Sequence, residues 1–273
     1  MDFGYGPEDE AFRAELRTWL DANLPDFVDG AEIGSGHGDE TRRTMARRQA
    51  WQQRLHRGGW AAINWPRRWG GREATTMQNV VYAEEMAEAR APGLYNANGV
   101  WQVGPMIMRW APEDHQERWL PGIIGATEHW CQGFSEPEAG SDLANLRTAA
   151  VADGDEYMLT GTKVWTSTAH LARWGLFLVR TDPDAIARGT KHEGITALIV
   201  DLDTPGITCT PIRDVTGQAM FCEVRFEDAR VPAAYRLGGE GDGWNVAMGT
   251  LAHERAGTGG IAIGLRAELA QMV

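Results

Sequence analysis

The sequence is poor in cysteine, and its few cysteines are not arranged for a shared site. Cys131, Cys209 and Cys222 are its three cysteines, and they form no CxxC pair and no His/Cys cluster. This spacing argues against a disulfide framework and against a zinc site, so we predict no metal. A reducing compartment is the expected location for such a chain.

Long hydrophobic runs are also missing. No stretch approaches the ~18 uninterrupted apolar residues that a membrane-spanning helix needs. The first residues show no basic start followed by an apolar run, so no signal peptide is predicted. We therefore expect a soluble, cytoplasmic protein without membrane insertion.

Positive charge is in short supply. Lys and Arg number 26 against 38 Asp and Glu, which gives a net charge of −12. So acidic a protein is a poor ligand for polyanions, and nucleic acids are not expected partners. Apolar residues at 43% and charged residues at 23% are typical of a globular protein, and 273 residues allow one large domain or two modest ones.

Helix signals dominate the first half of the sequence. Pro7 precedes three acidic residues, which favours a helix start, and apolar residues follow at helical spacing up to Leu24. Thr75 and Gln78 have the spacing of a capping box. The predicted helices are 7–24, 39–57, 75–89, 99–110 and 112–119, with an aromatic loop at 60–72.

The pattern changes to short strands near residue 128. Asp153-Gly154-Asp155 is a strong hairpin signal, and turn residues separate the runs on either side of it. Predicted strands are 149–151, 156–160, 163–167, 175–180, 195–200, 207–212 and 220–226. The sequence becomes helical again from Gly243. We predict an α+β fold with a helical N-terminal domain (1–127), an antiparallel β-barrel-like middle domain (128–238) and the first helix of a C-terminal bundle (239–273).

The segment from Trp130 to Leu143 carries the strongest functional signal. A strand end runs into a Pro/Gly-rich loop with two hydroxyls, Ser135 and Ser141. Backbone N–H groups and hydroxyls in such a loop can approach a flat or phosphorylated ligand. A plain turn between two strands is the alternative interpretation.

A second segment, Gly161 to Ser167, follows about thirty residues later. Side chains alternate along a strand, so Trp165 and Ser167 share one face. An indole beside a hydroxyl can stack on an aromatic ligand and hydrogen-bond its edge. The alternative is that Trp165 is an ordinary core residue.

Taken together, these two segments resemble the FSEPxAGSD and KxWxxS motifs of the acyl-CoA dehydrogenase family. Residues 7–24 are similar to the family's first helix, and 59–71 to its GW…WP…GG loop. The resemblance implies FAD as the cofactor and α,β-dehydrogenation of an acyl-CoA thioester to the 2-enoyl-CoA. It also implies an electron-transferring flavoprotein as acceptor and a role in fatty acid or lipid catabolism.

The resemblance assigns roles to particular residues. Ser135 matches a residue whose hydroxyl contacts the isoalloxazine ring of the flavin. Trp165 matches a residue that lies against the face of this ring, and Ser167 matches a residue that forms a hydrogen bond near its N5 edge. Ser141 matches a residue associated with the CoA ester. The complete set of implied cofactor-binding residues is Gln132, Phe134, Ser135, Gly140, Ser141, Trp165, Thr166 and Ser167.

The candidate catalytic base is Glu254. It matches a glutamate that, in a subset of the family, lies on the first helix of the C-terminal bundle, and Arg255 matches a substrate-contacting arginine beside it. Ala252 departs from relatives that carry Asp at this place. Without the resemblance, a Glu-Arg pair on a helix is typical of a solvated face, as is the basic run Arg42–Arg57, for which docking of an acidic partner is the minor alternative.

Three further hypotheses follow from the length of the sequence. Most of the family's C-terminal bundle has no counterpart in the 273 residues. The chain could therefore be incomplete, non-catalytic, or dependent on a partner in a homo- or hetero-oligomer. A flavin oxidase or monooxygenase of the same fold is a further alternative.

Overall fold

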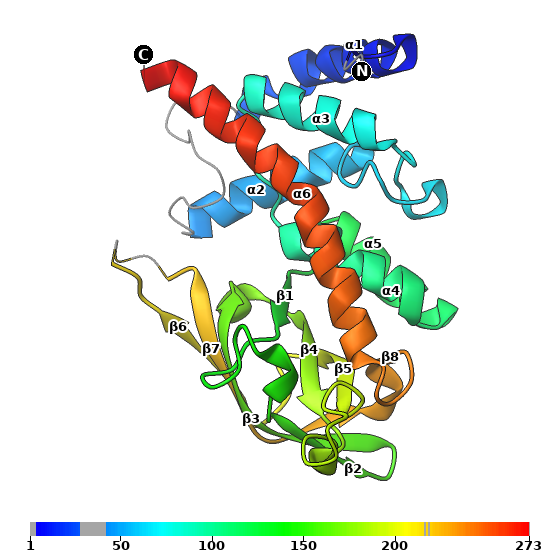
Figure 1. Cartoon of the computed structure of the whole chain (residues 1–273). Coiled ribbons are helices and arrows are strands. Elements are labelled where there is room, and N and C mark those ends of the chain that lie inside the picture. Colours follow the sequence, from blue (N-terminus) through cyan, green and yellow to red (C-terminus); the bar gives the residue numbers. More distant parts are fainter. Residues whose placement is uncertain (1–3, 28–41, 216, 218, 273) are drawn as a thin grey trace. The chain divides into compact units, whose positions relative to one another are not determined.

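A computed structural model describes residues 4–27, 42–215, 217 and 219–272 (Figure 1). The chain folds into two compact units. The helical unit comprises the described residues of 1–97, 124–126 and 254–273, and the sheet unit those of 98–123 and 127–253.

The helices follow the local signals in the sequence closely. Helix α1 has Pro7 in its first turn, and the Asp9 carboxylate accepts a hydrogen bond from the Gly6 N–H at 3.1 Å. Helix α3 begins with the predicted capping box between Thr75 and Gln78. The α-helices are α1 (Pro7–Asn23), α2 (Arg42–Arg57), α3 (Thr76–Glu88), α4 (Gly104–Trp110), α5 (Glu113–Ile124) and α6 (Gly243–Met272).

Some helix ends differ from the prediction. The residues before Arg42 in the second predicted helix lie outside the described residues. The predicted helix at 99–110 starts as a π-helical turn, Gly99–Val103, before α4 begins. Helix α5 continues past the predicted end at Trp119 to Ile124 and contains Pro121.

The core of the helical unit is built on buried tryptophans. Trp51, Trp60 and Trp65 are all at most 1% exposed, and the Phe12 ring meets the Trp60 ring edge-on with centroids 5.3 Å apart. The Arg72 guanidinium carbon lies 3.5 Å from the Trp60 ring centroid, in cation–π geometry. The predicted aromatic loop at 60–72 is therefore a packed part of this core.

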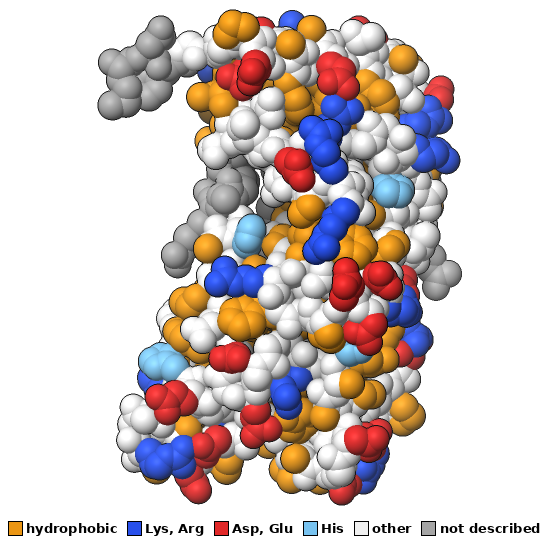
Figure 2. Space-filling view, turned by 90° about the vertical axis from the view of Figure 1, so that its right-hand side faces the viewer, with side chains coloured by type: hydrophobic (Ala, Val, Ile, Leu, Met, Phe, Trp, Pro, Cys, Tyr) orange, Lys and Arg blue, Asp and Glu red, His pale blue; other side chains and the backbone are white. Residues whose placement is uncertain are grey.

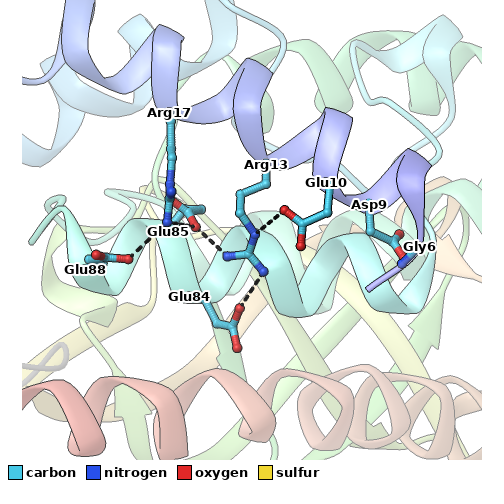
Figure 3. A network of polar contacts seen from close by, with 8 residues as sticks. All are labelled: Gly6, Asp9, Glu10, Arg13, Arg17, Glu84, Glu85 and Glu88. Carbon is cyan, nitrogen blue, oxygen red and sulfur yellow. Dashed lines mark hydrogen bonds and ion pairs between the residues drawn. The ribbon is translucent and has the colours of Figure 1, made fainter. Parts of the chain in front are cut away.

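An ionic network joins α1 to α3 (Figure 3). Glu85 is only 3% exposed, and its carboxylate accepts hydrogen bonds from both Arg13, at 2.5 Å, and Arg17, at 2.5 and 3.0 Å. Glu84 pairs with Arg13 at 3.0 Å, and the exposed Glu88 pairs with Arg17 at 3.4 Å. The buried carboxylate of Glu85 is thus the centre of the network.

The sheet unit contains one eight-stranded mixed sheet. Its strands run in the order β6-β7-β3-β2-β4-β5-β8, and β1 pairs with β4 outside this path. The strands are β1 (Trp130–Gly133), β2 (Ala149–Asp153), β3 (Glu156–Ser167), β4 (Trp174–Arg180), β5 (Ile195–Asp201), β6 (Ile207–Ile212), β7 (Phe221–Pro232) and β8 (Arg236–Leu237). Apolar side chains from these strands, including Phe177 and Phe226, form the unit's core.

The predicted fold class is confirmed, with two refinements. Helices precede a sheet that is followed by one helix, as predicted. The sheet is mixed, because β4 pairs in parallel with both β1 and β2. Its path ends at β6 and β8 without closing, so it resembles a barrel only loosely.

Two predicted strands, 156–160 and 163–167, form a single strand. The sequence pattern separates them at Gly161, but β3 runs through it with register shifts at 159–161 and 163–166. Gly161 has a φ of 151°, and a Cβ at this position would lie 2.7 Å from the Cα of Thr148. The glycine therefore marks an irregularity within the strand and a close backbone approach.

Charges of both signs share the molecular surface. On the face drawn in Figure 2, acidic and basic side chains are interspersed among hydrophobic ones. Surface ion pairs on the sheet unit follow the same pattern, for example Arg230 with Asp153 and Glu156. Such exposed pairs contribute little to stability.

Replacing Glu85 with Ala tests the importance of the α1–α3 network. The change leaves Arg13 and Arg17 without their shared buried partner, while Arg13 keeps its pair with Glu84 and Arg17 its pair with Glu88, so we expect the free energy of unfolding to fall by about 1–3 kcal/mol. The matched control is Glu88→Ala on the same helix, which removes an exposed pair and should cost less than about 1 kcal/mol. Urea unfolding followed by circular dichroism measures both, and equal losses would contradict this assignment.

Candidate functional site

The two predicted motifs lie side by side in the sheet unit. Strand β1 leads into the loop that starts at Phe134, and the second motif lies at the end of β3 (Figure 1). The Val164 N–H donates a hydrogen bond to the Ser135 carbonyl at 2.9 Å. Segments about thirty residues apart in the sequence therefore share a backbone hydrogen bond.

The loop after β1 is closed by its own backbone. Glu136 and Ala139 exchange two hydrogen bonds, N–H to O, at 3.0 and 3.1 Å. Ala139 is buried, whereas Gly140 and Ser141 are exposed beyond it. A Cβ at Gly140 would have nothing within 4 Å, so there is open space for a ligand at this part of the loop.

A buried ion pair connects the two motifs. The Lys163 ammonium lies 2.8 Å from Oε1 of Glu136 and donates a second hydrogen bond to the Phe134 carbonyl at 3.1 Å. The Glu136 carboxylate also accepts the backbone N–H groups of Arg147, at 2.6 Å, and Thr148, at 2.8 Å. Lys163 is 0% and Glu136 7% exposed. The carboxylate and the ammonium thus fix the loop to β3 and to the chain before β2.

Both members of this pair are charged near neutral pH. Burial lowers the pKa of Lys163 to about 8, against the opposing effect of Glu136. Burial by itself would raise the pKa of Glu136, but the Lys163 charge and three hydrogen bonds outweigh it and hold the pKa below its usual value. At pH 7 the pair is therefore ionic.

A third buried charge supports the chain after the loop. Arg180, on β4, is 4% exposed and donates hydrogen bonds to three carbonyls. These belong to Ala144 at 2.7 Å, Leu146 at 3.2 Å and Lys191 at 2.6 Å. Burial lowers the pKa of Arg180, and the nearby charge of Glu136 opposes this shift.

Trp165 is presented to the outside by an unusual backbone conformation. Its φ is 61°, in the left-handed region that an aromatic residue rarely adopts. The register of β3 against β7 shifts here, as in a β-bulge. The side chain is 59% exposed, and its ring meets that of Phe221 edge-on with centroids 6.0 Å apart. The alternative interpretation of Trp165 as a core residue is wrong.

The remaining predicted residues divide into accessible and buried ones. Ser135 and Ser167 are half-buried. Phe134 and Thr166 are buried and can only support the site from beneath. The side-chain carbonyl oxygen of Gln132 and the hydroxyl of Thr166 are buried atoms without a hydrogen-bond partner in the described part of the chain.

The predicted catalytic base and the predicted substrate-contacting arginine belong to a different part of the chain. Glu254 is exposed on α6 and belongs to the helical unit, whereas both motifs belong to the sheet unit. The side chain of Arg255 lies outside the described residues. The roles of these two residues stay predictions.

Three residues that hold the site together have no role in the sequence prediction. Glu136 and Lys163 stand within the two motifs, yet the resemblance assigns them no function. The first motif has a carboxylate near its start, Glu136, and the second begins with an ammonium, Lys163. These opposite charges are the sequence signal from which the pair could have been predicted. Arg180 lies on a buried strand with no motif around it, and nothing in the sequence marks it.

The arrangement suits a flat ligand with polar edges. It offers an exposed indole, two accessible hydroxyls and a rigid loop with open space beside Gly140. In the described part of the chain, no group of three His, Cys, Asp or Glu side chains could hold a metal ion. The described helices include none that is long and apolar enough to cross a membrane.

Comparison with known protein families decides between the interpretations of the motifs. The model of the acyl-CoA dehydrogenase N-terminal domain matches residues 6–127, and that of the acyl-CoA dehydrogenase middle domain matches residues 131–229. The chain belongs to the acyl-CoA dehydrogenase family. The resemblance that the two motifs predict is confirmed, and both motifs lie within the middle-domain match.

Individual acyl-CoA dehydrogenases and solved structures agree with this assignment. Acyl-CoA dehydrogenase IpdE1 of Mycobacterium tuberculosis (strain ATCC 25618 / H37Rv) is 44% identical over 246 residues, or 90% of this chain and 63% of the relative. The ChsE4-ChsE5 complex from Mycobacterium tuberculosis matches with a TM-score of 0.75 and 33% identity, covering 93% of this chain and 61% of that one. The Tcur3481-Tcur3483 steroid ACAD G363A variant matches with a TM-score of 0.80 and 31% identity, covering 93% and 65%. The chain thus spans less than two thirds of the length of these relatives.

Replacing Gly133 with Ala tests how tightly the end of β1, where the loop begins, is packed. A Cβ at Gly133 would overlap the ring of the buried Phe177, so Gly133→Ala should lower the free energy of unfolding by about 1–3 kcal/mol. Gly140→Ala is the control, because nothing surrounds that position, and it should change stability by less than about 0.5 kcal/mol. Thermal unfolding compares the two. Equal stability of both variants would show that β1 can shift away from Phe177.

Proposed function

We propose that this chain provides the flavin-binding part of an acyl-CoA dehydrogenase. The reaction is the FAD-dependent α,β-dehydrogenation of an acyl-CoA thioester to the 2-enoyl-CoA. The observation that carries the proposal is the joining of the two motifs at Ser135 and Val164, with Trp165 exposed beside them.

The residues present fit FAD. An exposed indole matches the apolar face of an isoalloxazine ring, and the hydroxyls of Ser135 and Ser167 match its polar edges. The side-chain oxygen of Gln132, on the strand that leads into the loop, is a buried acceptor without a hydrogen-bond partner among the described residues. Gln132, Phe134, Ser135, Gly140, Ser141, Trp165, Thr166 and Ser167 are the residues that would hold the cofactor.

Each of the chain's own groups has a defined task in this proposal. Bound FAD supplies the hydride acceptor, which no side chain can provide. Glu254 removes the α-proton of the thioester as a general base. Ser141 and Arg255 bind the CoA ester and orient it, and the loop holds Ser135 and Trp165 in place.

The remaining proposals concern organisation. We divide the chain into a helical N-terminal domain (1–127), a middle domain (128–238) and the first helix of a C-terminal domain (239–273). An electron-transferring flavoprotein is the proposed electron acceptor, and the cytoplasm the proposed location. Two similar structures are named as pairs, ChsE4-ChsE5 and Tcur3481-Tcur3483, which supports a hetero-oligomer.

The names of two similar structures support a proposal on the substrate class. The Tcur3481-Tcur3483 structures are named steroid ACAD and are 31% and 32% identical to this chain. We therefore include a CoA ester that carries a steroid ring system among the proposed substrates, beside straight-chain acyl-CoA.

Flavin bleaching under anaerobic conditions tests the function. The full chain mixed with FAD should be yellow after gel filtration, and a matching acyl-CoA should bleach the absorbance at about 450 nm that is typical of oxidised flavins. Glu254→Gln should keep the flavin but lose at least about 10²-fold in the bleaching rate, because the base is gone. Glu117→Gln, at an exposed position on α5, is the control and should bleach as fast as the wild type.

Each outcome of this experiment has a separate meaning. A wild-type chain that stays colourless with FAD contradicts flavin binding by this chain alone. The same gel filtration then tests whether a co-expressed relative of the paired type forms a yellow complex with it. Bleaching that survives in Glu254→Gln contradicts Glu254 as the base and leaves flavin binding intact.

A further inference from the structure

Three charged side chains are buried beside the loop that follows β1 and carries the first motif. Among the described residues of the sheet unit, the buried side chains with a formal charge are Glu136, Lys163 and Arg180. One carboxylate faces two cations, so the group carries one excess positive charge. The proposed reaction does not use any of the three directly.

We infer that a positioning group favours reduction of the bound flavin, and that it consists of Glu136, Lys163 and Arg180. It acts through its excess positive charge and through the hydrogen bonds by which it holds the loop. This inference rests on the proposed function, since it requires FAD beside Ser135 and Trp165. It adds a role for residues that do not touch the cofactor in that proposal.

The geometry places these charges next to the proposed contacts. Ser135 stands between Phe134, whose carbonyl accepts a hydrogen bond from Lys163, and Glu136, which pairs with the same ammonium. On the other strand, Lys163 is two residues before Trp165. The ammonium therefore lies beneath the backbone that presents both the hydroxyl and the indole.

Burial makes the charges effective over a distance. In the interior, where the effective dielectric constant is far below that of water, a charge acts more strongly on its surroundings than at the surface. The Lys163 ammonium lies 2.8 Å from the Glu136 carboxylate, and this contact opposes the lowering of its pKa by burial. Arginine stays protonated in proteins at neutral pH.

Stability alone does not account for such a group. Replacing a buried ion pair with apolar residues of similar size is often neutral or stabilising. The loop could thus be packed on β3 without buried charge. A cluster whose buried members carry one more positive than negative charge is instead suited to a ligand that gains negative charge, as a flavin does when it is reduced. Asp182, at the surface, also acts on Arg180, but from the solvent-exposed side.

An electrostatic role and a purely structural role predict different signs for the shifts in the flavin's reduction potential. Glu136→Gln and Lys163→Met both break the same 2.8 Å contact. The second variant removes one positive charge. The first removes one negative charge, and it raises the net positive charge by one unit only while Lys163 stays protonated, because loss of Glu136 lowers the pKa of Lys163 further. If the charge acts on the flavin, Glu136→Gln raises its reduction potential and Lys163→Met lowers it. If the pair only holds the loop, both variants shift the potential in the same direction or leave it unchanged.

The experiment measures the reduction potential of FAD bound to the full chain over a pH range from about 5 to 8, against a reference dye. The opposite shifts are expected at the low end of this range, where Lys163 stays protonated without Glu136. The variants are Glu136→Gln, Lys163→Met and the double variant, which restores the net charge and should fall between the two. Lys191→Met is the matched control. Lys191 also lies 2.8 Å from a carboxylate, that of Asp142, but this pair is exposed and solvent screens it, so the potential should not change.

The result that supports the inference is a pair of opposite shifts with no shift in the control. Shifts of equal sign, or equal shifts in Lys163→Met and Lys191→Met, overturn it. If the two neutral variants take up no flavin, Lys163→Arg and Glu136→Asp keep the charges while changing the contact. They should retain the wild-type potential, and a change in either would overturn the inference. A wild-type chain that binds no FAD overturns the proposed function instead.

Discussion

The ion pair between Glu136 and Lys163 is the interaction on which the candidate site depends. It joins a loop after β1 to the end of β3, and its carboxylate also holds the chain that leads into β2. With this pair in place, the backbone bond from Val164 to Ser135 sets the two motifs in fixed register. The pair and this hydrogen bond thereby fix the arrangement of the loop, the indole and the hydroxyls. A site that is ordered in advance loses less conformational entropy when a ligand binds.

The fold was predictable wherever local chemistry determined it. Pro7, the capping box at Thr75 and the hairpin at Gly154 each act through neighbouring residues, and each stands where the sequence places it. The parallel pairing of β1 with β4 was not predictable, because it depends on contacts between distant segments. Gly161 shows the same limit, since a strand break and a strand irregularity have the same local signal.

The sequence predicts which side chains would face a ligand, and it misses the residues that support them. Motif resemblance identified Ser135, Trp165 and Ser167, and the structure brings their segments together. The left-handed backbone at Trp165 and the buried charge of Arg180 left no trace in the sequence pattern. In the sequence, a buried arginine cannot be told from an exposed one, because the carbonyls that it binds come from distant segments. Glu85, at the centre of the α1–α3 network, was missed for the same reason.

The central claim is that FAD lies against Trp165, and time-resolved fluorescence of the bound flavin tests it most directly. An indole in contact with a flavin quenches its emission, so the lifetime should be short in the wild-type chain and clearly longer in Trp165→Phe. The exposed Trp101 provides the comparison, because Trp101→Phe should leave the lifetime unchanged. Equal lifetimes in the wild type and Trp165→Phe would contradict the claim.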